Sequence, residues 1–152
     1  SIPLTANTED TAARLINYFQ TDAAHLHVYS RTDWQSPLAS GSNAPNAMVV
    51  CPCTMGTAAA IAHGMSDDLL TRAADVMLKE RKPLILVPRE SPLSAIHLEN
   101  LLTLSRLGVT ILPPMMTFYH QPTSIEDMTD HVVERILVHL NLPHSNIYRW
   151  GK

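Results

Sequence analysis

The chain has 152 residues, a formal net charge of −3 and a hydrophobic fraction of 45%. This length suits one domain with a sizeable core, and the acidic balance argues against nucleic acid as the partner. No apolar run approaches the ~20 residues of a membrane span and no secretory leader is visible, so the sequence predicts a cytoplasmic protein without a membrane span. Only 16% of the residues are charged, which suggests that much surface is hidden, as in an oligomer.

The two cysteines, Cys51 and Cys53, lie too close together for an ordinary disulfide framework. We interpret them as reduced thiols. The eight histidines are scattered, and no pair has a known ligand spacing. The sequence therefore predicts no metal site.

The first third of the chain predicts one helix and two strands. A helical apolar pattern covers residues 8–20, and a short strand is predicted over 25–29. Residues 32–46 are rich in Ser, Pro, Asn and Gly and predict a loop. Residues 47–51 predict a buried strand that ends at Pro52.

Helices and strands then alternate. Small residues predict a helix over 54–63, and an amphipathic helix follows over 67–80. The apolar run 84–87 stands between prolines and predicts a buried strand. Ser91 is predicted to cap a helix over 93–107, with Pro92 at its first position, and a strand follows over 109–112. The clearest helix covers 124–140, where Ser124 and Asp127 approximate a capping box.

Strands that alternate with helices indicate a mostly parallel α/β sheet. Such a sheet places the carboxyl ends of its strands on one edge, where ligands bind. Three segments converge there and define a candidate pocket: residues 52–54, 89–90 and 113–119.

Each of these residues also has an ordinary structural interpretation. Thr54 and Thr57 are common helix caps, although a helix start with small residues also holds phosphate. Arg89 beside Glu90 fits either an anion site or an internal ion pair. Arg135 fits a plain polar helix face, and Arg72 an ion pair with Asp68 or Asp75. Spacing alone therefore predicts a nucleotide- or phosphate-binding α/β domain.

Several strings in a fixed order closely resemble the UbiX family of flavin prenyltransferases. They are CPCTMGT (51–57), IAHG (61–64), LLTRAADV (69–76), LKERKPL (78–84), PRESPL (88–93), and ILPP (111–114) followed by FYHQP (118–122). The resemblance runs from residue 42 to 142. It implies a Rossmann-like or flavodoxin-like three-layer sandwich, here a single flavoprotein domain over residues 1–152. The family belongs to the flavin-containing Cys decarboxylase fold group.

The resemblance also implies a metal-independent reaction. The family transfers a dimethylallyl group from dimethylallyl monophosphate to reduced FMN, which makes prenylated FMN for a UbiD-type decarboxylase. Older names call such proteins aromatic acid or polyprenyl-hydroxybenzoate decarboxylases, with a link to ubiquinone biosynthesis. The family forms homo-oligomers, and a dodecamer is the expected assembly. Cations must then hold the phosphate, whose charge grows as it leaves.

Site residues follow from the resemblance position by position. Lys79 and Arg89 match basic residues at the flavin and allyl-phosphate site, and Glu90 matches a glutamate linked to proton handling. Tyr119 and Arg135 match the residues that contact the allyl phosphate, together with Lys79. The flavin-binding turn matches four residues here in addition to Arg89, namely Cys53, Thr54, Met55 and Thr57.

The chain departs from the family pattern in two places. Gly56 stands where the family's turn has a lysine, and no Gly-rich loop after a first strand occurs. We therefore expect the first βα unit to be missing from this chain. Two further functional hypotheses remain open: a non-catalytic FMN-binding or assembly protein, and a flavin-dependent decarboxylase of the same fold group.

Overall fold

A parallel sheet of three strands, in the order β1-β2-β3, organises the structure, a computed structural model that describes residues 7–119 and 121–143. The strands are β1 (Met48–Cys53), β2 (Leu84–Pro88) and β3 (Thr110–Ile111). Val49 pairs with Ile85, and Ile85 pairs in turn with Thr110. The predicted parallel α/β sheet is confirmed.

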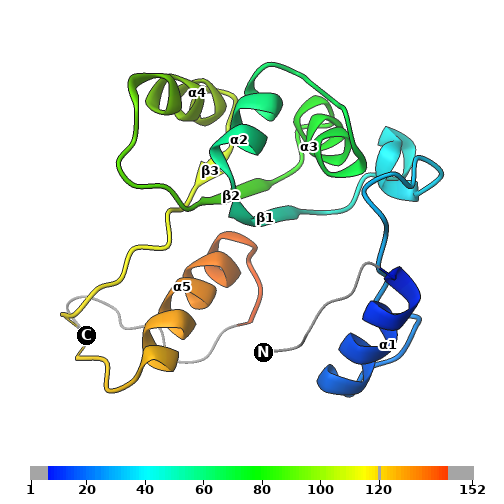
Figure 1. Cartoon of the computed structure of the whole chain (residues 1–152), viewed down its shortest axis with the longest axis horizontal. Coiled ribbons are helices and arrows are strands. Elements are labelled where there is room, and N and C mark those ends of the chain that lie inside the picture. The colour runs from blue at the N-terminus through cyan, green and yellow to red at the C-terminus, as the bar shows by residue number, and fades with distance from the viewer. Residues whose placement is uncertain (1–6, 120, 144–152) are drawn as a thin grey trace.

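Helices lie on both sides of this sheet (Figure 1). One side carries α2 (Met55–Ala62), α3 (Leu69–Lys79) and α4 (Ala95–Arg106), and the other carries α5 (Ile125–His139). The first helix, α1 (Thr8–Phe19), lies apart from the sheet (Figure 1). Two short 3-10 helices, η1 (Pro37–Ala39) and η2 (Gly41–Asn43), run beside α3. The arrangement is the three-layer sandwich that the resemblance implies.

Local capping explains where these helices begin. Ser124 accepts a hydrogen bond from the Asp127 N–H, and the Asp127 carboxylate accepts the Ser124 N–H in return. This is the predicted capping box, and its hydrogen bonds to Thr123 and Ser124 lower the pKa of Asp127 to about 2. Such a capping box provides hydrogen-bond acceptors for backbone N–H groups that the start of a helix leaves without partners.

The core is centred on β2, whose five residues are all buried. Leu84 and Leu86 point to the side of α2, α3 and α4, where one cluster of buried side chains forms. Its largest members are Met77, Leu86 and Leu104, each with no exposed surface. Because β2 is covered on both faces, its sequence is continuously apolar, as in parallel sheets generally.

Two sequence-based predictions about local structure are wrong. Residues 25–29 form no strand, because no strand of the described residues lies beside them to exchange backbone hydrogen bonds. Ser91 and Pro92 do not open a helix. Ser94 does so instead, since its hydroxyl accepts the His97 N–H while the His97 ring accepts the Ser94 N–H.

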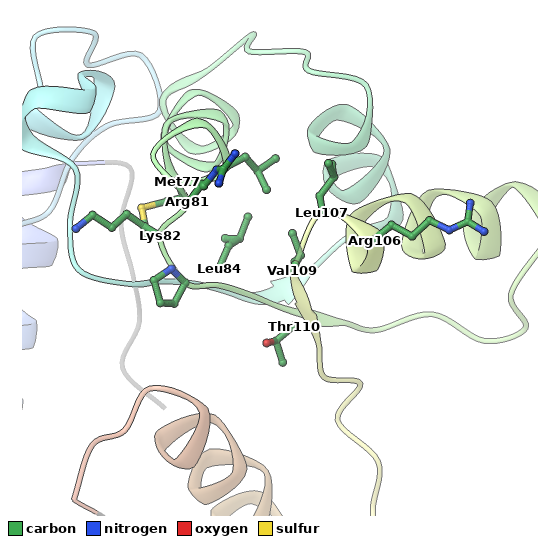
Figure 2. Close-up of a pocket in the computed structure, with 11 residues that line it drawn as sticks. Met77, Arg81, Lys82, Leu84, Arg106, Leu107, Val109 and Thr110 are labelled. Carbon is green, nitrogen blue, oxygen red and sulfur yellow. The ribbon is translucent and has the colours of Figure 1, made fainter.

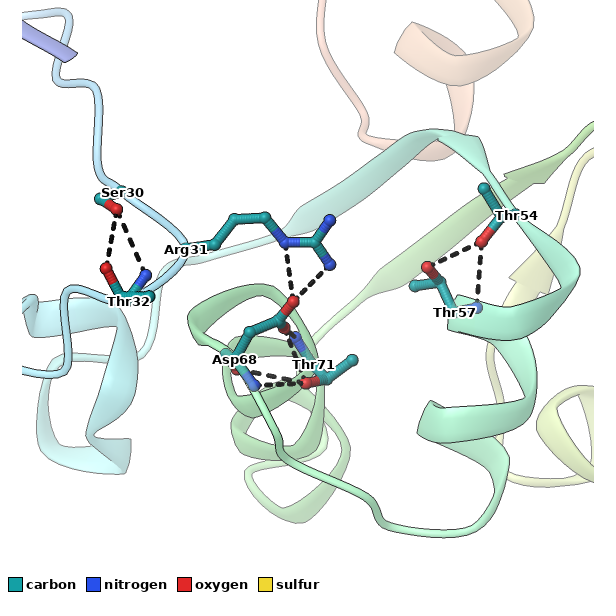
Figure 3. Close-up of polar contacts among 7 residues, drawn as sticks. All are labelled: Ser30, Arg31, Thr32, Thr54, Thr57, Asp68 and Thr71. Atoms are coloured by element: carbon teal, nitrogen blue, oxygen red, sulfur yellow. Dashed lines mark hydrogen bonds and ion pairs between the residues drawn. The ribbon is translucent and has the colours of Figure 1, made fainter. Parts of the chain in front are cut away.

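An ion pair between Arg31 and Asp68 fastens the long first loop to the start of α3 (Figure 3). The backbone adds a 2.8 Å hydrogen bond from the Leu69 N–H to the Arg31 carbonyl. Burial favours the neutral carboxyl of Asp68, but hydrogen bonds from Thr71 and Arg31 outweigh it and lower its pKa. Arg72 pairs with Asp75 at 2.7 Å, which decides between its two predicted partners.

We expect Leu104→Ala to lower the free energy of unfolding by about 2–5 kcal/mol, because it leaves a cavity in a fully buried cluster. Urea denaturation followed by circular dichroism measures this loss. Ser105→Ala, one residue further along α4 and exposed, is the matched control and should change stability by less than about 0.5 kcal/mol. Equal effects of the two substitutions would contradict this placement of the core.

Candidate active site

The carboxyl ends of the strands meet, as predicted. The Arg89 N–H donates to the Cys53 carbonyl at 3.3 Å, which ties the segment after β2 to the end of β1. The Leu112 N–H donates to the Leu86 carbonyl at 2.8 Å, which ties the segment after β3 to β2. Three segments distant in sequence therefore share one edge of the sheet.

The turn from β1 into α2 presents backbone and hydroxyl groups at this edge. Thr54 caps α2: its hydroxyl accepts the Thr57 N–H at 3.1 Å and lies 3.0 Å from the Thr57 hydroxyl (Figure 3). Cys53 and Met55 are buried in the core, so their side chains face away from any ligand on the surface. The part of this turn that is open to a ligand consists of Thr54, Thr57 and the free N–H groups of the first helical turn.

Gly56 lies in open space within this turn. A Cβ added there would meet only the Thr54 hydroxyl, at 3.8 Å. Its backbone has no positive φ, so no conformational need for glycine exists. The position would accommodate the lysine that the family pattern has there.

Arg89 and Glu90 line a cavity of about 340 Å³ that continues to Pro113 and Met115. Both charged residues are exposed, and Glu90 Oε1 accepts the Ser91 N–H at 3.1 Å. Among the ion pairs of the described chain, none joins Arg89 to Glu90, so the internal ion pair considered from the sequence does not form.

Arg135 lines a second cavity of about 330 Å³, which shares Pro113 and Met115 with the first. His131, one helical turn before Arg135, lines it as well and packs its ring edge-on against Tyr119, with ring centroids 6.3 Å apart. Arg135 therefore lies in a cavity that adjoins the Arg89 cavity, while Tyr119 contacts this second cavity through His131 and lines neither of the two. Met115 lies in the segment 113–119 that the sequence placed in the candidate pocket. His131 was not predicted as a site residue, although its four-residue spacing from Arg135 could have indicated it.

Lys79 lies elsewhere. Lys79 is the last residue of α3, and the segment after it leads into the amino end of β2. Arg89, in contrast, follows the carboxyl end of β2. Five residues of strand separate these ends by about 17 Å. Lys79 Nζ pairs with Glu80 Oε1 at 2.5 Å, and this hydrogen bond lowers the pKa of Glu80. Within one chain, Lys79 therefore does not join the other predicted site residues.

A larger cavity, of about 650 Å³, opens at that amino edge of the sheet. Its cations are Arg81, Lys82 and Arg106, and its apolar lining residues include Leu84 and Val109. Figure 2 shows that Lys82 and Arg106 extend in opposite directions, away from Leu84 and Val109. These cations stand at the carboxyl ends of α3 and α4, where positive charge is favourable for the helix dipoles, so they do not form a convergent anion site.

Two features of the described residues bear on metal ligands and on membranes. In residues 7–119 and 121–143, no three His, Cys, Asp or Glu side chains come together as metal ligands would. None of the helices in the same ranges has the length and apolar character needed to cross a bilayer.

Comparison with known sequences identifies relatives among flavoproteins. Residues 4–137 match the family model described as Flavoprotein. The flavin prenyltransferase UbiX of Pseudomonas aeruginosa is 52% identical over 151 residues, covering 99% of this chain and 72% of that protein. The UbiX protein of Methanocaldococcus jannaschii is 49% identical over 123 residues, covering 81% of this chain and 67% of its own length.

The chain belongs to the UbiX family of flavoproteins.

Solved structures of UbiX proteins share its fold. A dodecameric FMN-dependent UbiX-like decarboxylase from Escherichia coli O157:H7 superposes with a TM-score of 0.82 at 43% identity, over 96% of this chain and 74% of that one. A UbiX protein in complex with FMN and dimethylallyl pyrophosphate gives a TM-score of 0.81 at 44% identity, over 93% of this chain and 78% of that one. The family and the fold expected from the sequence are both confirmed.

We expect only one of the two thiols of this UbiX chain to react quickly with a thiol reagent at pH 8. Cys51 is exposed, whereas Cys53 is 1% exposed and burial raises its pKa to about 11. About one Cys53 side chain in a thousand is then a thiolate at pH 8, and the thiolate is the reacting form. Timed labelling with a chromogenic disulfide measures the fast stoichiometry, and Cys51→Ser should abolish the fast phase. Two fast thiols per folded chain would show that Cys53 is not part of the core.

Proposed function

We propose that the chain is a flavin prenyltransferase that transfers the dimethylallyl group of dimethylallyl monophosphate to reduced FMN. The product, prenylated FMN, would serve a UbiD-type decarboxylase. The observation that carries this proposal is the pair of adjoining cavities, which places Arg89 and Glu90 beside Arg135 around shared Pro113 and Met115. Membership of the UbiX family gives these groups a reaction to perform.

The turn at the start of α2 supports an FMN site. Free N–H groups and the positive end of the helix dipole favour one terminal phosphate there, with the Thr54 and Thr57 hydroxyls as further partners. The backbone of Cys53 and Met55 lies in the same turn, and Arg89 reaches the edge from β2. When bound, reduced FMN supplies the nucleophilic flavin ring that accepts the allyl group.

We assign Arg135, which lines the second cavity, and Tyr119, which packs against His131 of that cavity, to the allyl phosphate. A phosphate that leaves gains charge, and a guanidinium paired with it stabilises that charge more in the transition state than in the ground state. Among the described residues, Glu90 is the only carboxylate that lines the two cavities, which suits it to move a proton from the flavin. Pro113 and Met115 add apolar walls, but both are exposed in the single chain. Keeping water away from an allylic cation therefore requires a second copy of the chain to cover them.

Lys79 fits this site only if it comes from another copy of the chain. Within one chain the length of β2 separates it from Arg89. Many large apolar side chains are exposed in the single chain, among them Ile96, Leu98 and Leu102 on α4 and Phe118 near the site. The UbiX-like protein of Escherichia coli is a dodecamer. We therefore propose a homo-oligomer, with twelve chains as the expected number, in which sites form at junctions between copies.

We also propose that the protein is cytoplasmic, because its two cysteines are free thiols, as is usual in that reducing compartment.

We expect Arg135→Ala to lower catalytic efficiency about ten- to a hundredfold, because a charge-assisted contact contributes roughly 1.5–3 kcal/mol. FMN affinity should stay unchanged, since Arg135 lies on α5 and not at the turn before α2. The assay is anaerobic, with reduced FMN, dimethylallyl monophosphate and enzyme, and mass spectrometry detects FMN heavier by one prenyl unit.

Arg81→Ala is the control for Arg135→Ala, because it removes the same charge at the amino edge of the sheet. It should leave the rate within about twofold. If Arg135→Ala prenylates FMN as fast as the parent, its assigned role is wrong. If the parent binds FMN but makes no heavier product, the non-catalytic FMN-binding hypothesis replaces this one.

A second prediction concerns the sharing of sites between copies. Lys79→Ala and Arg135→Ala should each retain about a tenth of the activity or less alone. Their co-expression should restore intact sites at about a quarter of the positions by random mixing, and so raise the activity above that of either variant. Light scattering on the parent should show a large oligomer at micromolar concentration. No recovery in mixed oligomers, or a monomer by light scattering, would argue that one chain builds its site alone.

A further inference from the structure

The short helix η2 passes directly under the end of α3. Gly41 begins η2, and its Cα faces the ion pair between Lys79 Nζ and Glu80 Oε1. A Cβ built on Gly41 would overlap both charged atoms, and it would lie 3.0 Å from Glu80 Cδ. Because Gly41 carries a hydrogen in place of a Cβ, there is room beside it for the Lys79 ammonium and the Glu80 carboxylate to pair.

The backbone at Gly41 does not itself require glycine. The described glycines with positive φ are Gly64 and Gly108, so Gly41 has an ordinary conformation that alanine also adopts. The atoms that a Cβ would meet are the tips of two flexible side chains, which are 47% and 37% exposed. The space above Gly41 therefore matters to the position of those tips and little to the fold.

The loop cannot simply move away, because it is fastened two residues earlier. Arg72 Nε donates to the Ala39 carbonyl at 3.0 Å, while Arg72 Nη1 pairs with Asp75 at 2.7 Å. Arg72 and Lys79 are seven residues apart, so they stand two turns apart on one face of α3. The loop from Ala39 to Gly41 is therefore held against that face of α3, next to the side chain of Lys79.

We propose that Gly41 is a positioning residue: together with Glu80 it seats the Lys79 ammonium where that group meets the phosphate of the allyl substrate. The proposal rests on the phosphate-binding role of Lys79 in the proposed function. Glu80 is the counterion that holds the ammonium in place, and Gly41 is the gap that permits this pairing. A side chain at position 41 would displace the ammonium by the width of a methyl group, which is enough to weaken a charge-assisted contact.

The test is Gly41→Ala in the full chain, compared with Ser42→Ala. Ser42 lies in the same short helix, and its hydroxyl contacts only Ser40 among the described hydrogen bonds, at 3.0 Å. We expect Gly41→Ala to raise the KM for dimethylallyl monophosphate about three- to tenfold, with FMN affinity and melting temperature unchanged. Ser42→Ala should leave all three values unchanged.

A second measurement reports on the ammonium without the reaction. Brief acetylation followed by mass spectrometry gives the reactivity of Lys79 relative to Lys82, which lies outside this pair. The pair protects Lys79, so Gly41→Ala should raise this ratio, by about threefold or more. In a Lys79→Ala background, Gly41→Ala should have no additional effect on KM, because the two residues act through one contact.

Each result then has one meaning. An unchanged KM and an unchanged acetylation ratio would overturn the proposal, as would an equal KM effect with Lys79 absent. Loss of the folded state in Gly41→Ala would also overturn it, since Gly41 would then serve the fold. A parent that makes no prenylated FMN overturns the proposed function and the substrate half of this proposal, while the acetylation ratio still decides whether Gly41 seats Lys79.

Discussion

Burial of β2 on both faces is the constraint on which the rest of the structure depends. Its backbone is hydrogen bonded in parallel to β1 on one side and β3 on the other, and all five of its side chains are withdrawn from water. Because the three strands are parallel, the segments that follow them all leave the sheet at the same edge. Thr54, Arg89 and the segment from Pro113 therefore meet without any direct attraction among them, and their chemistry is available at one place.

The same constraint separates the basic residues into two groups. The segments that lead into β2 and β3 begin at the ends of α3 and α4. Lys79, Arg81 and Arg106 therefore gather at the amino edge of the sheet. There they complement helix dipoles. Arg89 stands at the carboxyl edge, and Arg135 approaches the adjoining segment from α5. A single chain thus divides its cations, and a site that uses both groups has to be built from more than one copy.

Sequence patterns were most informative where local physics is sufficient. The run 84–87 between prolines predicted β2, and Ser124 with Asp127 predicted the start of α5, because these signals act within a few residues. The pattern at 25–29 failed because a strand exists only with a neighbour to pair with. Ser94 replaced Ser91 as the cap because the reciprocal bonds with His97 were available to Ser94.

The sequence by itself determined the family, the order of helices and strands, and the residue types that phosphate chemistry needs. It determined them because motifs, periodicity and capping are local properties of the chain. Only the tertiary structure decided which of these residues are neighbours. It placed Arg135 in a cavity that adjoins the Arg89 cavity and packed Tyr119 against His131 of that second cavity. It also buried Cys53 and Met55 in the core and placed Lys79 next to Gly41 at the opposite edge. Such proximity depends on how the helices pack on the sheet, and no spacing along the chain encodes that distance.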